Sequence, residues 1–159
     1  MSTFNDVFNK SEIYNMFFFN VKAVLEYSTL AELKENNEPM YNNWKHTSKI
    51  KYGCDIESTD EKEANEVYVN HAVYIPEYCK IVAITYATLY LEDGQIKRYF
   101  KKIVDKEETI VLETFIDVLK QISSDSAQST PQEFPILCGH NIVNYDIPLL
   151  IKRFVKLSS

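Results

Sequence analysis

The pattern of hydrophobic and polar residues along the chain predicts two strand-forming stretches separated by a helical one. Residues 16–24 are rich in β-forming side chains and short enough for a central strand. Residues 80–102 form a longer stretch of the same kind, interrupted by Glu92-Asp93-Gly94. Glycine adopts a positive φ freely, so these three residues indicate a tight turn. We therefore expect a single strand followed later by a β-hairpin.

The helical stretches are marked by caps and by apolar residues at helical spacing. Residues 28–75 are predicted to be a helical insertion, in which Ser28 or Thr29 caps the first helix and Pro39 lies near the start of the next. Residues 107–123 give the clearest helix, because a broad apolar stripe follows an acidic start.

The last part of the chain, residues 134–156, predicts a strand, a turn and a helix. The apolar run 134–138 is typical of a strand that is buried on both faces. Asn144 is interpreted as the N-cap of the helix. Lys152 and Arg153 lie near the end of the helix, where cations suit the helix dipole.

The candidate chemistry lies in the turn of this unit. Asp146 is expected at the mouth of the sheet, beside His140 and Asn141. Ligands of open α/β sheets bind at the carboxyl ends of the strands, so this turn is the expected site. His140 is interpreted as a hydrogen-bonded turn histidine. Asn141 is interpreted either as a backbone-binding turn residue or as a nucleotide contact.

Composition narrows the class of protein. The 159 residues suit a single domain, 1–159, and an apolar content of 45% with 25% charged residues is that of an ordinary globular protein. The net charge of −6 argues against broad nucleic-acid binding, which needs clustered Lys and Arg. Three cysteines without C-x-x-C spacing indicate reduced thiols. Reduced thiols indicate a cytosol-like compartment, so we expect a cytoplasmic location, or a phage-encoded protein in the host cytoplasm or the virion. No apolar run approaches the roughly 20 residues of a membrane span.

Two strings of residues resemble a known family. The run Gly-His-Asn-Ile-Val-Asn-Tyr-Asp-Ile-Pro-Leu-Leu, from Gly139 to Leu150, resembles the second carboxylate motif of the DnaQ-like (DEDD) 3′–5′ exonucleases. The nearest group is the phage and bacterial one related to the proofreading domain of family-B DNA polymerases. Pro-Glu-Tyr-Cys-Lys-Ile-Val, from Pro76, resembles the string that introduces the second strand of this family. The resemblance implies an α/β, RNase H-like fold with a mixed sheet.

The chain also departs from the family pattern. The Asp-x-Glu of the first strand aligns with Asn20 and Lys22, which leaves Asp146 as the retained carboxylate. Active relatives continue through another strand and a helix with Tyr-x-x-x-Asp or His-x-x-x-Asp, so the resemblance implies a fold that lacks its last strand and helix. Active relatives use Mg²⁺ or Mn²⁺, but no cofactor is expected here. We expect the Lys22 ammonium to pair with Asp146 in place of a metal.

The sequence leaves several functions open. One is an inactive exonuclease-like domain that acts as a binding or structural module, in a phage particle or a replication complex. Another is an active exonuclease that is completed by another chain, or an inactivated form of one. A third is nucleic-acid binding without cleavage through His140 and Asn141, which the net charge disfavours. An open sheet edge also predicts a protein partner or a homo-oligomer.

Overall fold

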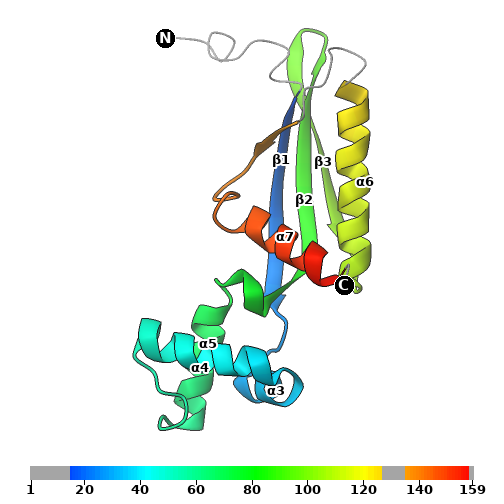
Figure 1. Ribbon diagram of the computed structural model, residues 1–159. Coiled ribbons are helices and arrows are strands. Elements are labelled where there is room, and N and C mark those ends of the chain that lie inside the picture. Colours follow the sequence, from blue (N-terminus) through cyan, green and yellow to red (C-terminus); the bar gives the residue numbers. More distant parts are fainter. Residues whose placement is uncertain (1–14, 127–134, 158–159) are drawn as a thin grey trace, which may run out of the picture.

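The computed structural model describes residues 15–126 and 135–157, which form a mixed sheet with helices against one face and a helical insertion at one end (Figure 1). The elements follow one another as β1 (Met16–Leu25), α3 (Leu30–Asn36), α4 (Glu38–Tyr52), α5 (Glu61–Ala72), the 3-10 turn η1 (Pro76–Tyr78), β2 (Cys79–Glu92), β3 (Gln95–Val104), α6 (Glu108–Ser126), β4 (Ile136–Cys138) and α7 (Asp146–Leu157). The expected α/β class is confirmed.

The four described strands lie in the order β3-β2-β1-β4. The pairs β1–β2 and β2–β3 are antiparallel, whereas β4 runs parallel to β1. Asp93 and Gly94 join β2 to β3 with φ values of 53° and 75°, the backbone of a two-residue hairpin turn. The strand predicted at 16–24 and the hairpin predicted at 80–102 are therefore confirmed.

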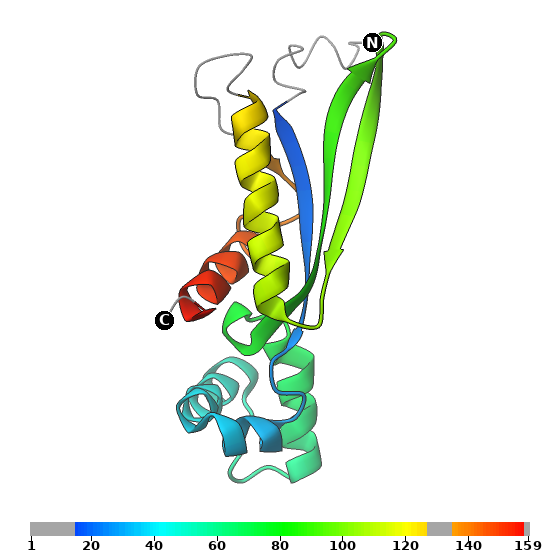
Figure 2. The ribbon, with the colours of Figure 1, turned by 90° about the vertical axis from the view of Figure 1, so that its right-hand side faces the viewer.

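Both long helices after the hairpin pack against the same face of the sheet (Figure 2). Alternate residues of β1, namely Phe17, Phe19 and Val21, point into this core, as the period of a strand requires. The ring of Phe115 from α6 lies 5.6 Å from that of Phe19. The helix predicted at 107–123 is confirmed as α6, and no described helix covers the opposite face of the sheet.

The helical insertion predicted at 28–75 is confirmed and has a core of its own. Trp44 is fully buried there, and Tyr68 and Tyr78 meet its ring edge-on, each at 5.4 Å between ring centroids. Thr29 caps α3 by accepting a hydrogen bond from the backbone N–H of Glu32, as the sequence predicted. The insertion thus packs beside the end of the sheet as a separate cluster.

The prediction of a strand buried on both faces at 134–138 is wrong. β4 covers only Ile136–Cys138, and Ile136 and Leu137 are 45% and 41% exposed. β4 is an edge strand that pairs with β1 alone among the described elements, so its other side is open. An apolar run marks a strand but does not show on how many sides it is covered. Phe134, which belonged to the prediction, lies outside the described residues.

Candidate functional site around Asp146

Asp146 is the first residue of α7, and its carboxylate is buried against β1. The side chain is 3% exposed, and one of its oxygens accepts a hydrogen bond from the backbone N–H of Val21. The other oxygen, Oδ2, is buried and has no hydrogen-bond partner among the described residues. Buried polar atoms are almost always paired, so this oxygen marks a place where a ligand or a proton is needed.

The turn before α7 brings Asp146 to this position. At Gly139 a Cβ atom would lie 2.6 Å from the carbonyl oxygen of Phe19, so only glycine lets the chain pass this close to β1. Asn141 has a φ of 56°, and its carbonyl accepts hydrogen bonds from the N–H groups of Asn144 and Tyr145. The turn is therefore closed by its own backbone and rests against β1.

The start of α7 differs from the prediction in one detail. Asn144 is not the N-cap residue, because α7 begins at Asp146 and Tyr145 therefore holds that position. The side-chain amide of Asn144 donates to the side chain of Asn141 at 2.9 Å. Instead the carbonyl of Tyr145 accepts the bond from the Leu149 N–H at 2.9 Å, and its hydroxyl donates to the Val73 carbonyl at 2.9 Å. Tyr145 thus ties the turn to the helical insertion.

Asn20 and Lys22 lie on either side of the residue that binds Asp146. Both are on β1, and the register between β1 and β2 shifts between Lys22 and Ala23. Such bulges bend a strand and redirect side chains, and they are common beside functional sites. Asn20 is half-buried and Lys22 is exposed. Both positions therefore flank the backbone group that binds Asp146, and Lys22 is near enough to influence the pKa of Asp146.

The expected ion pair between Lys22 and Asp146 is not formed. Burial raises the pKa of Asp146, while the Val21 hydrogen bond and the neighbouring Lys22 and His140 side chains act in the opposite direction without cancelling it. Lys22 is exposed, and a lysine ammonium is strongly hydrated in such a position. Asp146 stays in the buried turn, so it is left without a cation in direct contact.

His140 and Asn141, the two predicted nucleic-acid contacts, are exposed residues of the same turn. The side chain of Asn141 binds Asn144, and its backbone carbonyl closes the turn, which supports the interpretation of Asn141 as a turn residue. His140 is close enough to Asp146 to influence its pKa. Both remain accessible to a ligand that approaches Asp146.

The donors around Asp146 do not form a cluster of the kind that holds a divalent ion. Within residues 15–126 and 135–157, no group of three or more His, Cys, Asp or Glu side chains is placed to bind a metal. Asp146 Oδ2 is a buried carboxyl oxygen without a hydrogen-bond partner among the described residues, and the neighbouring β1 positions carry an amide and an ammonium. Two Mg²⁺ ions need several carboxylates, so these residues do not fit a two-metal centre.

The buried ionic cluster at the other end of α7 was not predicted from the sequence. Arg153 is 5% exposed and donates to Glu108 and to Glu26, the latter at 2.9 Å. It was expected only as a cation that suits the helix dipole. The signal was its spacing, because Asp146, Leu149, Leu150 and Arg153 recur at helical spacing and are the buried residues of α7.

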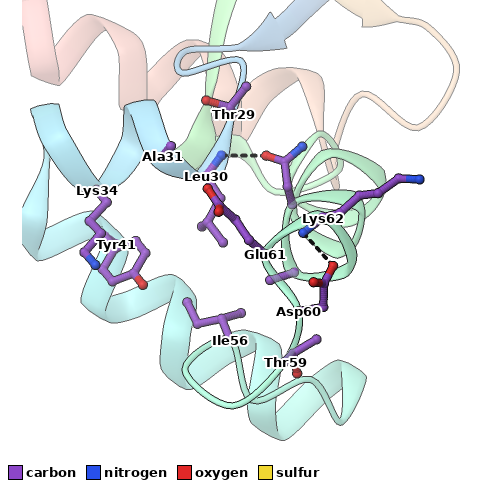
Figure 3. Close-up of a pocket in the computed structure, with 12 residues that line it drawn as sticks. Thr29, Leu30, Ala31, Lys34, Tyr41, Ile56, Thr59, Asp60, Glu61 and Lys62 are labelled. Atoms are coloured by element: carbon purple, nitrogen blue, oxygen red, sulfur yellow. Dashed lines mark hydrogen bonds between the residues drawn. The ribbon is translucent and has the colours of Figure 1, made fainter.

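A separate pocket of about 680 Å³ lies in the helical insertion, between α3, the loop before α5, and α5 itself (Figure 3). Its polar groups already stabilise the insertion. Asp60 accepts hydrogen bonds from the N–H groups at the start of α5, and Asn65 accepts one from the Leu30 N–H at 2.9 Å. None of the residues that line the pocket has a buried side-chain polar atom without a hydrogen-bond partner among the described residues, so Asp146 is the better candidate.

Comparisons with protein-family models, with curated proteins and with solved structures find no match for this chain. The function of this chain is therefore inferred from the geometry around Asp146. None of the helices within the described ranges is long and apolar enough to cross a membrane.

Proposed function

We propose that this chain is an RNase H-like, exonuclease-like domain that has lost two-metal catalysis and acts as a binding or assembly module. The strand order β3-β2-β1-β4, with β4 parallel to β1 and α6 between β3 and β4, supports the proposal. The resemblance to the DnaQ-like exonucleases implies the same order. The start of α7 at Asp146 adds support, because the family motif places its carboxylate after the fourth strand.

The observation that carries the proposal is the set of side chains beside Asp146. The Val21 hydrogen bond holds the carboxylate next to the positions occupied by Asn20 and Lys22. An amide is a weaker ligand for Mg²⁺ than a carboxylate. An ammonium about 4 Å from a cation is repelled by about 4 kcal/mol per unit of charge at an effective dielectric constant of 20. A divalent ion at this position would meet twice that repulsion.

A second candidate is an active metal-dependent 3′–5′ exonuclease that is completed by another chain. It is favoured by Oδ2 of Asp146, which is buried without a hydrogen-bond partner among the described residues. A cation supplied with further carboxylates would give this oxygen a partner. In this alternative the chain needs the other chain before it can bind metal.

The partner of the binding module is proposed at the open side of β4. Ile136 and Leu137 are exposed apolar residues there, and β4 is an edge strand among the described elements. Exposed edges and apolar patches favour association. A protein partner or a second copy of the chain would cover this edge.

The test is to rebuild the missing carboxylates and to measure Mn²⁺ binding by electron paramagnetic resonance. We expect no specific binding by the natural chain and binding by the Asn20→Asp/Lys22→Glu variant. Adding Asp146→Asn to that variant should abolish the binding again, which controls for adventitious sites. This readout does not depend on activity or on knowing the nucleic acid.

A nuclease assay tests whether the chain has metal-dependent nuclease activity of its own, without another chain. The natural chain is incubated with a 5′-labelled single-stranded DNA oligonucleotide and Mn²⁺, with Asp146→Asn as the control. We expect no shortening from either protein. Shortening by the natural chain that disappears in Asp146→Asn would refute the proposal and support the metal-dependent enzyme.

A further inference from the structure

The outer strand β3 differs in charge from the rest of the chain. It carries Lys97, Arg98, Lys101 and Lys102 and no acidic residue, whereas the whole chain has a net charge of −6. Residues 95–102 are exposed along their whole length. The described residues place no strand on the outer side of β3, so this edge of the sheet is open.

The cations of β3 lie on both faces of the sheet. Lys101 pairs across the ladder with Tyr86, which belongs to the core under α6. Lys97 and Lys101 therefore lie on the helix-covered side, whereas Arg98 and Lys102 lie on the opposite side. An acidic strand added to this edge would therefore lie beside positive charge, whichever face of the sheet its acidic side chains are on.

Two of these cations are available for a ligand. Lys97 pairs with Glu92, and the Lys101 ammonium lies 5.3 Å from the centre of the Tyr99 ring. Arg98 and Lys102 form no ion pair with any side chain in the described ranges. In a two-residue hairpin the pair next to the turn, here Glu92 and Gln95, is hydrogen-bonded, and bonded pairs alternate along the strands. The N–H and C=O groups of Arg98 and Lys102 therefore point outward.

The acidic charge of the chain is concentrated elsewhere. Residues 28–75 contain nine acidic side chains against five basic ones. Figure 1 shows this insertion at the opposite end of the molecule from the β2–β3 turn. Charges separated by more than the Debye length, about 8 Å at physiological salt, are largely screened. The acidic charge of the insertion is therefore largely screened at the turn end of β3.

Lysines on an edge strand also prevent wrong pairing. A second copy that paired its β3 with this one would place like charges opposite each other on both faces, which is unfavourable. The same cations favour a strand of opposite charge. The edge therefore discriminates against a second copy and in favour of an acidic strand.

We propose that β3 binds an extended acidic segment of a partner protein as an added strand. Backbone hydrogen bonds to the outer edge supply affinity, and Arg98 and Lys102 select the acidic side chains. This inference does not depend on the site around Asp146, so either can fail without the other.

The test uses a fluorescein-labelled peptide of alternating Glu and Val, about ten residues long to match β3, in an anisotropy titration. We expect saturable binding that weakens as salt rises. Arg98→Glu/Lys102→Glu should weaken binding by about tenfold or more, because two exposed charge pairs turn from attraction to repulsion. The control Lys51→Glu/Lys120→Glu has the same net charge and should stay close to the natural chain.

The ligand provides a second control that does not depend on protein folding. A peptide N-methylated at alternate backbone positions keeps its charge but cannot form the ladder, so we expect it not to bind. Equal binding of the methylated peptide, or no binding of the original, would overturn the proposal. It would also be overturned if unlabelled single-stranded oligo(dT) displaced the peptide at lower concentration than unlabelled peptide does, because β3 would then be a nucleic-acid surface.

Discussion

The two charged residues at opposite ends of the buried face of α7 differ in how completely their polar atoms are hydrogen-bonded. At its end Arg153 donates to Glu108 and Glu26, and all three are largely buried. At its start Asp146 receives a single hydrogen bond from the Val21 backbone and keeps one oxygen unpartnered. Both residues are at most 5% exposed, so both have lost water. Only one has regained partners for all of its polar atoms.

The difference separates a structural site from a candidate functional one. Burial alone would raise the pKa of Glu26, but the bonds from Lys156 and Arg153 outweigh it and lower the pKa. At Asp146 burial prevails and the pKa is raised. A buried group whose charge is poorly compensated, at the end of a strand, is a marker of a functional site. α7 is therefore anchored by ion pairs at one end and carries an incompletely partnered carboxyl at the other.

The largest predicted effect comes from breaking the anchored end. Glu108→Ala removes a partner of the Arg153 guanidinium and also the acceptor of the Ile81 N–H bond at 2.6 Å. Removing one partner of a buried ion pair costs about 3 kcal/mol or more. We expect urea denaturation to show a loss of this size.

The matched control is Glu113→Ala, which removes an exposed glutamate from the same helix. Its free energy of unfolding should stay within about 0.5 kcal/mol of that of the natural chain. Equal losses in the two variants would mean that the cluster around Arg153 does not anchor α7.

The next effect concerns the turn that carries Asp146. Gly139→Ala would bring a Cβ atom within 2.6 Å of the Phe19 carbonyl oxygen and onto the side chain of Ile142. Overpacking of this kind costs about 2 kcal/mol. We also expect the Val21 amide signal to shift in NMR spectra, because the turn has to move away from β1 and takes Asp146 with it.

Gly94→Ala is the comparison for this variant. Gly94 has a φ of 75° but no atom within 4 Å of an added Cβ, so the cost is conformational only, about 1 kcal/mol. The Val21 signal should not move. A shift of the Val21 signal in Gly94→Ala as large as that in Gly139→Ala would show that this signal does not report on the turn that carries Asp146.

The sequence predicted the strands and helices well wherever a period marked them. The helix predicted at 107–123 is α6, Glu108–Ser126, and the strand predicted at 16–24 is β1, Met16–Leu25. Burial of the strand predicted at 134–138 was not predictable in the same way. Its apolar run is compatible with cover on one side or on both, and only the strand order decides between them.

The candidate site was predicted in part, for a similar reason. The resemblance of Gly139–Leu150 to a carboxylate motif identified Asp146, and the alignment of the first strand identified Asn20 and Lys22. The hydrogen bond from the Val21 backbone to Asp146 could not be predicted from the sequence, because it depends on where β4 ends beside β1. The expected Lys22–Asp146 pair failed because a one-dimensional alignment does not show which side chain is buried.

The smallest effect, and the most informative about the two ends of α7, is the pH dependence of Asp146→Asn. The folded-state pKa of Asp146 is raised above its ordinary value of 3.8, so the native carboxyl contributes stability below that pH and loses it as the pH rises through the folded pKa. Asp146→Asn should therefore gain stability relative to the natural chain as the pH rises through the folded pKa of Asp146. Glu26→Gln should behave in the opposite way, because the pKa of Glu26 is lowered and its contribution disappears as the pH falls below 4.5. Urea denaturation across this range measures both slopes, and a loss of stability in Asp146→Asn that grows with pH would mean that the carboxylate is ionised and fully partnered.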